Sequence, residues 1–136
     1  MVMLPRLLTA AAVALFAALP VAEAGAVVKG GAWAGKATSM DRSIRYGKVT
    51  FKVKGKTMRN LKIEGVTVSS TCGGLTTIVV PKLTIKGNRF IGAYQPVPGV
   101  DDIISVNGTI KGGTAKGTFS EGPLCSGAGR FTARAK

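Results

Sequence analysis

The sequence predicts an all-β domain of about eight short strands, folded as a single antiparallel barrel or as a two-sheet sandwich, with one disulfide. From Ile44 onward the apolar residues recur with period two, which is the pattern of strands that bury one face. Glycine-containing pairs separate these runs where the chain must reverse. No run after Ala24 shows the helical period of apolar residues. These observations do not choose between the barrel and the sandwich.

The alternation is clearest in five runs that carry apolar residues on one face and polar residues on the other. Their apolar members are Val49, Phe51 and Val53; Leu61 and Ile63; Leu83 and Ile85; Ile104, Val106 and Ile110; and Phe131 and Ala133. Because successive side chains of a strand point to opposite faces, the intervening lysines, arginines and threonines are predicted to face solvent. The alternation of apolar and polar residues shifts by one position at Glu64-Gly65, which predicts a glycine-type bulge, with a tight turn as the alternative.

Reversals of the chain are predicted at glycine. The candidate turns are Gly87-Asn88, Gly112-Gly113 and Lys54-Gly55-Lys56. Two-residue hairpin turns need positive φ to match strand twist, and glycine adopts it without a Cβ clash. Two less regular stretches, 73–81 and 95–102, contain Pro81, Pro96 and Pro98, so we predict that they are loops or sheet edges.

The first 24 residues are predicted to be a cleaved signal peptide. Arg6 supplies positive charge, residues 7–21 are apolar and uncharged, and Ala22-Glu23-Ala24 has the form that signal peptidase accepts. A membrane span would need about 20 apolar residues, whereas this run is shorter and contains Pro20. Cleavage would leave residues 25–136 as one basic all-β domain without a stable membrane anchor. We expect the domain to be secreted and either free outside the cell or associated with the cell wall, or to lie in the periplasm if the bacterium is Gram-negative.

The chain has two cysteines, Cys72 and Cys125. In an exported protein two cysteines most often pair with each other, so a disulfide between them is predicted. In the chain-entropy account, closing this loop contributes roughly 4 kcal/mol by restricting the unfolded chain.

The composition excludes several classes of enzyme. The chain has no histidine, which removes catalytic triads, imidazole zinc sites and histidine pH switches. Only carboxylate or lysine chemistry remains, and the neighbouring carboxylates Asp101 and Asp102 would diverge on a strand. A carboxylate enzyme would need one of them beside Glu121 in a cleft. We therefore predict a protein that is not an enzyme, with no catalytic residues, no metal and no cofactor.

The positive charge is the main indication of function. The chain carries 19 basic and 6 acidic residues, and loss of Arg6 and Glu23 with the signal peptide leaves the net charge at +13. The densest basic group, predicted to bind a polyanion, is Lys48, Lys52, Lys54, Lys56, Arg59 and Lys62. If the strands on either side of Gly55 pair, these side chains share one face and create a positive field. The alternative is that the charge only keeps the protein soluble.

Trp33 lies in Gly31-Ala32-Trp33, which resembles the first-strand motif of the lipocalin and avidin-like barrels. The resemblance implies that Trp33 closes one end of a barrel and that a basic residue of the last strand, Arg130 or Arg134, packs on it by a cation–π contact.

A broader likeness covers nearly all of residues 31–136 and is to uncharacterised small secreted bacterial β-proteins. It is carried by Trp33-Ala34-Gly35, Cys72-Gly73-Gly74, Gly87-Asn88-Arg89-Phe90, Gly113-Thr114-Ala115-Lys116-Gly117, Cys125-Ser126-Gly127 and Phe131-Thr132-Ala133-Arg134. This resemblance implies the fold but no activity.

Together these observations favour a secreted, non-catalytic protein that binds an anionic polymer such as a cell-wall polymer, an acidic glycan or extracellular nucleic acid. The alternative is a calycin-like or inhibitor-like barrel that binds a small ligand or a partner protein. The small-ligand alternative requires an accessible apolar cavity. An interior filled by the phenylalanines would leave no room for a ligand. These are Phe51, Phe90, Phe119 and Phe131.

Overall fold

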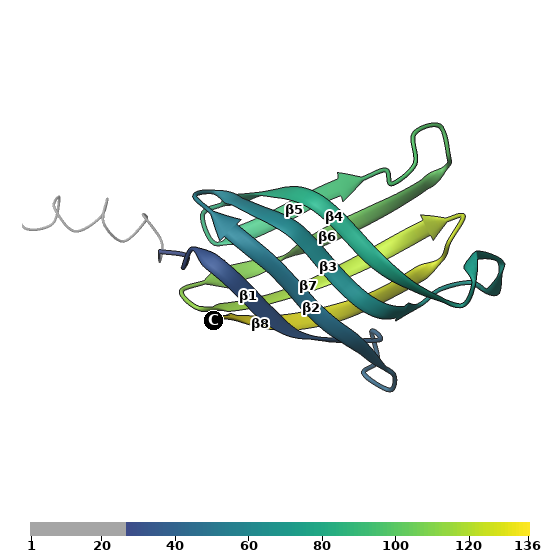
Figure 1. Ribbon diagram of the computed structural model, residues 1–136, viewed down its shortest axis with the longest axis horizontal. Coiled ribbons are helices and arrows are strands. Elements are labelled where there is room, and N and C mark those ends of the chain that lie inside the picture. The colour runs from purple at the N-terminus through teal and green to yellow at the C-terminus, as the bar shows by residue number, and fades with distance from the viewer. Residues whose placement is uncertain (1–26) are drawn as a thin grey trace, which may run out of the picture.

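The computed structural model describes residues 27–136, so the predicted signal peptide lies outside the described residues. Eight strands form one closed antiparallel barrel in which each strand pairs with its sequence neighbours and β8 closes on β1 (Figure 1). The strands are β1 (Gly31–Thr38), β2 (Arg45–Lys54), β3 (Thr57–Thr67), β4 (Leu75–Lys86), β5 (Arg89–Tyr94), β6 (Asp102–Lys111), β7 (Thr114–Pro123) and β8 (Gly127–Ala135). The barrel, rather than the sandwich, is therefore the fold of this domain. No helix within the described range has the length and apolar character needed to cross a membrane.

Aromatic side chains fill the interior of the barrel. The four phenylalanines predicted as core are each at most 3% exposed, and Trp33 is 1% exposed. Trp33 stacks on Phe51 with ring centroids 5.3 Å apart, and Phe90 lies 6.1 Å from Phe131. The alternation read in the sequence therefore separates an apolar interior from a polar exterior.

One end of the barrel carries the tight hairpins and both ends of the described chain. The turns at Gly55, Gly87 and Gly112 are confirmed, and their φ angles are 61°, 60° and 58°. The segment before β1 crosses this end, where Val28 bridges to Gly112. Trp33 lies beneath this segment, and its Nε1 donates a hydrogen bond of 3.0 Å to the carbonyl oxygen of Lys29.

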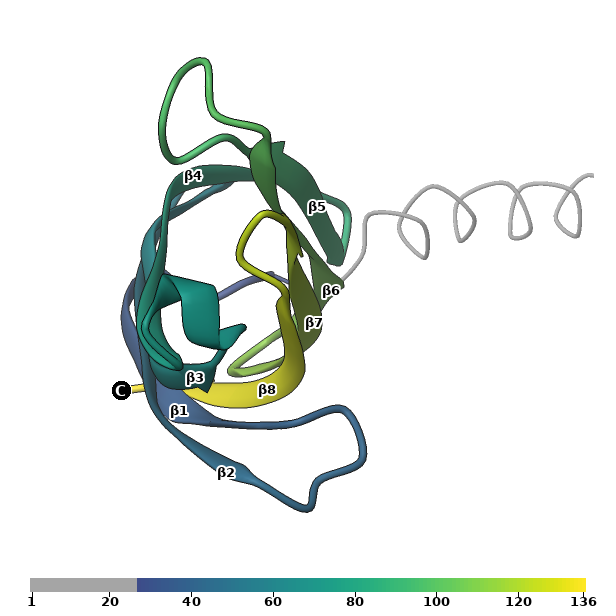
Figure 2. The ribbon, with the colours of Figure 1, turned by 90° about the vertical axis from the view of Figure 1, so that its right-hand side faces the viewer.

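The opposite end carries four longer loops, at residues 39–44, 68–74, 95–101 and 124–126. The second contains the short 3-10 helix η1 (Ser70–Cys72), which lies across the mouth of the barrel in Figure 2. The predicted disulfide is confirmed: Cys72 and Cys125 are bonded, with Cα atoms 5.6 Å apart. It joins the β3–β4 loop to the β7–β8 loop and so ties opposite walls of the barrel together at this end.

The irregularities of the strands have local causes. The bulge at Glu64-Gly65 is confirmed, because the β3–β4 register shifts between Ile63 and Val66 and Gly65 has a φ of 66°. The prediction that residues 73–81 are irregular is wrong from residue 75 onward, since Pro81 lies within β4. β5 pairs only with the last three residues of β4, so Pro81 lies on a stretch that has β3 as its only neighbour. There the missing N–H interrupts no second ladder.

Candidate anion-binding surface

The outside of the barrel is basic and almost without negative charge. The described residues contain no ion pair, and of their five carboxylates only those of Asp41 and Asp101 belong to fully exposed residues. Every strand from β1 to β8 carries at least one exposed lysine or arginine, and on the outer faces of β7 and β8 the basic residues alternate with threonine. The field outside the barrel is therefore set by cations that no acidic side chain compensates.

The structure brings the predicted basic group together on the outer face of β2 and β3. All six predicted residues, Lys48, Lys52, Lys54, Lys56, Arg59 and Lys62, are exposed. Lys52 lies directly opposite Arg59, and Arg59 lies opposite Lys82 of β4. We call Lys52, Arg59 and Lys82 the cation row. Like charges that face each other across strands destabilise a sheet, so this row raises the free energy of the unliganded barrel.

A second row of basic residues runs around the barrel in the other direction, and the sequence analysis missed it. The row crosses the strands in the order β2, β1, β8, β7, β6 and β5, and each of its residues lies directly opposite the next. In that order the residues are Lys48, Lys36, Thr132, Lys116, Thr109 and Arg89. These positions are up to 96 residues apart in the sequence, and only the register of a closed barrel places them side by side. The alternation of threonine with cations along this row was not visible from spacing along the chain.

A groove lies on this second face, between the β1–β2 loop and the outer sides of β5 to β8. In Figure 2 this loop extends outside the ring on the side of β8. The part of the groove lined by Arg42, Arg89, Lys116 and Arg130 has a volume of about 280 Å³, and we call it the Arg130 groove. It continues into a hollow of about 580 Å³ with which it shares Asn107 and Thr118.

Asp41 holds the β1–β2 loop in the conformation that presents Arg42. Its carboxylate accepts hydrogen bonds from the hydroxyls of Ser39 and Ser43, both at 2.7 Å, and from the backbone N–H of Ser43 at 3.0 Å. These hydrogen bonds lower the pKa of Asp41 to about 2, so it remains ionised at physiological pH. Arg42 has a φ of 66°, which is uncommon for a residue with a side chain. The loop is thus ordered by its own polar contacts.

Arg130 is the residue of this groove whose unsatisfied donor is buried. It belongs to β8, where it lies opposite Thr38 of β1 and Thr118 of β7. Its side chain is half-buried, and its Nε atom is buried with no hydrogen-bond partner. Buried donors are nearly always paired in folded proteins, so this atom marks a position that accepts a further partner.

The expected contact of Arg130 or Arg134 with Trp33 is wrong. Trp33 points into the barrel and stacks on Phe51, whereas Arg130 and Arg134 lie on the outer face of β8. Arg134 is the cross-strand partner of Ala34, whose side chain points away from the interior. The wall of the barrel therefore separates both guanidinium groups from the indole. Trp33 itself lies at the hairpin end, where its Nε1 donates to the carbonyl oxygen of Lys29.

The structure places Asp102 beside Glu121, the arrangement that a carboxylate enzyme would require. Asp102 opens β6, is 4% exposed and shares a hydrogen bond with Glu121 of β7. Burial and the neighbouring Asp102 raise the pKa of Glu121 to about 7, while the hydrogen bond from Glu121 lowers the pKa of Asp102. The pair lines none of the surface hollows described above. The two carboxyl groups are therefore as close as a carboxylate enzyme would require, but they do not lie in a cleft.

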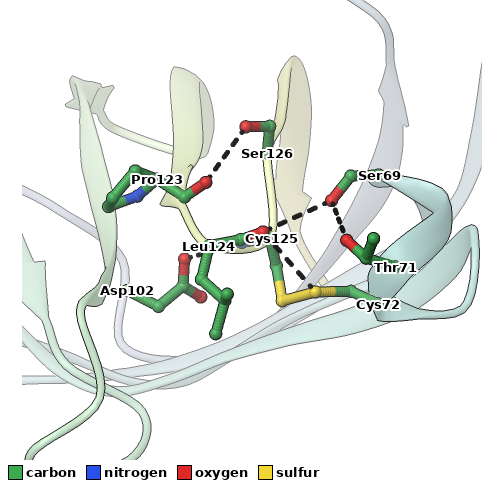
Figure 3. The surroundings of a disulfide bond; sticks show 8 residues. All are labelled: Ser69, Thr71, Cys72, Asp102, Pro123, Leu124, Cys125 and Ser126. Atoms are coloured by element: carbon green, nitrogen blue, oxygen red, sulfur yellow. Dashed lines mark hydrogen bonds between the residues drawn. A yellow bond between two sulfur atoms is a disulfide. The ribbon is translucent and has the colours of Figure 1, made fainter.

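The sulfur of Cys125 lies with these two carboxylates, with all three candidate ligand atoms within 4.8 Å of one another. Figure 3 shows Asp102 under the β7–β8 loop next to the disulfide. Because the sulfur is bonded to Cys72, it is not a thiolate, which is the form of cysteine that binds metals. The cluster is better described as a structural anchor of the loop end.

In comparisons with known proteins, no family model, no curated protein and no solved structure matches this chain. The resemblances in motif order and in the first strand therefore remain expectations.

Proposed function

We propose that this protein is an exported, non-catalytic binding protein for an anionic polymer, which it holds on the outside of its barrel. The candidate polymers are a cell-wall polymer such as teichoic acid, an acidic glycan and extracellular nucleic acid. The observation that carries the proposal is the register that sets Lys52 opposite Arg59 and Lys36 opposite Lys48 with no carboxylate paired to any of them.

The arrangement of the charge favours binding over a role in solubility alone. Solubility requires only a net charge, and lysines scattered far apart supply it at no cost in stability. Here cations are direct cross-strand neighbours, which destabilises the sheet until an anion lies between them. A polymer with regularly spaced negative groups relieves this repulsion along a whole row and releases its own counterions.

The filled interior favours the outer surface as the binding site. Trp33, Phe51, Phe90, Phe119 and Phe131 are buried within the barrel. A small barrel filled by side chains lacks the accessible apolar cavity that the small-ligand alternative requires. The interior of the barrel therefore gives no support to that alternative.

The test is binding of teichoic acid, a sulfated glycan and single-stranded DNA to the protein with its disulfide formed, at several salt concentrations. We expect affinity for at least one polymer to fall steeply as salt rises, since each neutralised phosphate adds to the salt dependence. The double variant Lys52→Glu/Arg59→Glu should lower this affinity roughly tenfold or more at low salt.

The matched control is Lys111→Glu/Lys136→Glu, which changes the net charge by the same amount outside both rows. Equal losses in the two variants would mean that net charge alone attracts the polymer. Binding that is weak for all three polymers, or unaffected by salt, would refute the proposal.

A further inference from the structure

The Arg130 groove is formed by two parts of the chain that approach from different directions. The outer faces of β5, β7 and β8 form the floor of the groove and supply Arg89, Lys116 and Arg130. The ordered β1–β2 loop supplies Arg42 from the side. An adjoining hollow of about 250 Å³ shares Arg42 and Arg130 and adds Lys36. Cationic groups therefore surround one small volume from more than one side.

The groove contains donors but no charged acceptor. None of the residues that line it carries a carboxylate. The hydroxyls of Thr109 and Thr132, at its floor, make no hydrogen bond within the described part of the chain. The Nε–H of Arg130 is likewise buried without an acceptor. Leaving a buried donor of a charged group unsatisfied is unfavourable, so an anion that accepts from Nε after a small shift of the Arg130 side chain would remove this penalty.

The geometry of the donors selects the class of anion. A carboxylate is planar and has two oxygens, which suits a single guanidinium. Here the donors come both from the sheet and from the loop, which suits an acceptor whose oxygens point in several directions, as those of a tetrahedral group do. Arginine is also the preferred partner of phosphate. We propose that the Arg130 groove binds a tetrahedral oxyanion, the phosphate or sulfate ester group of a ligand. This deepens the proposed function and rests on it for the polymer that carries the group.

The neighbouring hollow is consistent with a ligand that extends beyond the oxyanion. It is lined by small and apolar side chains, among them Met40, Ala93 and Ala128, and by Ser105 and Ser120. Because it shares Asn107 and Thr118 with the Arg130 groove, an ester bound at Arg130 would place its carbon skeleton there. Sugar rings present both apolar faces and hydroxyls, and this lining offers partners to both.

The experiment follows the Nε–Hε resonance of Arg130 by NMR while sodium phosphate, sodium sulfate or sodium acetate is added at constant ionic strength in chloride. We expect phosphate or sulfate to shift this resonance saturably and acetate to leave it unchanged. The variant Arg130→Lys keeps the charge but removes the Nε–H, and it should weaken binding of phosphate or sulfate roughly tenfold or more. Arg134→Lys, on the same strand and face, is the matched control and should bind like the wild type.

A second variant, Lys116→Gln, changes an exposed side chain and tests the site even if Arg130→Lys fails to fold. It should weaken binding of the oxyanion without altering the unfolding midpoint. An Arg130 resonance that phosphate and sulfate leave in place, or that acetate shifts equally, would overturn the inference. If teichoic acid or DNA still binds with steep salt dependence in that case, the proposed function stands without this site. If phosphate binds at Arg130 but no polymer does, the proposed function fails and the oxyanion site remains.

Discussion

The backbone N–H of Cys125 donates a hydrogen bond of 3.0 Å to Oδ1 of Asp102, which ties the β7–β8 loop to the start of β6. Asp102 in turn shares a hydrogen bond with Glu121. The disulfide partner Cys72 lies in the β3–β4 loop, where the backbone N–H of Ser69 donates to the carbonyl oxygen of Ser126 at 3.1 Å. One end of the barrel is thus held by a covalent bond and by a hydrogen-bonded pair of carboxyl groups.

This carboxyl pair predicts a pH dependence of stability. The pKa of Glu121 rises from 4.5 to about 7 on folding, so the folded chain holds a proton that the unfolded chain releases in this interval. The stabilisation is complete below pH 4.5 and is lost as the pH rises through about 7. We expect the urea midpoint to be lower at about pH 8 than at about pH 5. The chain has no histidine, so few other groups titrate there.

Glu121→Gln tests the cause, because a glutamine still donates a hydrogen bond to Asp102 but does not titrate. The variant should unfold at nearly the same urea concentration at both pH values. A pH response as large as that of the wild type would assign the effect to other groups.

The disulfide is expected to contribute much of the stability of this small barrel. The Cys72→Ser/Cys125→Ser variant should lose about 4 kcal/mol of unfolding free energy, because the unfolded chain is no longer restricted by a cross-link. Denaturant unfolding of the variant, and of the wild type under reducing conditions, measures the loss. Equal midpoints for the oxidised and reduced wild type would show that the loop-end hydrogen bonds suffice.

Closure of the barrel depends on a close approach at Gly35. A Cβ atom at this position would lie 1.8 Å from the carbonyl oxygen of Thr132, so Gly35→Ala must displace the backbone of β8. We expect a loss of about 3 kcal/mol in thermal or denaturant unfolding, at the upper end of the range for overpacking. Gly30→Ala is the control, since its Cβ would meet no atom closer than 3.5 Å. Gly30→Ala should be neutral or slightly stabilising, because alanine restricts the unfolded chain. A comparable loss in both variants would show that the close approach at Gly35 is not the cause.

Repulsion in the cation row should be measurable without any ligand. Lys52→Thr removes the cation that faces Arg59, and we expect it to stabilise the barrel by about 0.5 kcal/mol at low salt. Lys62→Thr is the matched control, because Lys62 lies between Thr50 and Val79 and has no cation opposite. If both variants gain equally, β-propensity rather than repulsion is the cause. Added salt should reduce the gain in Lys52→Thr alone.

Export is tested by the mass of the protein recovered after expression of the whole chain in a bacterial host. We expect the recovered chain to begin at Gly25 and to be lighter by two hydrogen atoms, which are lost when the two thiols are oxidised to the disulfide. A chain that retains its first 24 residues would refute cleavage after Ala24.

The alternation of Val49, Phe51 and Val53, the glycine turns and the pairing of Cys72 with Cys125 were all predictable from the sequence. Each of these features depends on local chemistry or on the number of residues of one type. A strand exposes alternate side chains, glycine adopts positive φ, and two cysteines in an exported chain can form a disulfide only with each other. The basic group on β2 and β3 was predictable for the same reason, since its two strands are joined by one short turn.

Only the tertiary structure could decide which residues meet when their strands are distant in sequence. The proximity of Asp102 to Glu121, the row from Lys36 to Arg89 and the groove around Arg130 depend on the register between strands and on the closure of β8 onto β1. Alternation states which face a side chain occupies but not which residue lies beside it on the next strand, because a sheet can shift by two residues without changing either face. The sequence by itself determined an all-β domain, filled by aromatic residues and basic outside. The tertiary structure decided that it closes into a barrel and where its charges meet.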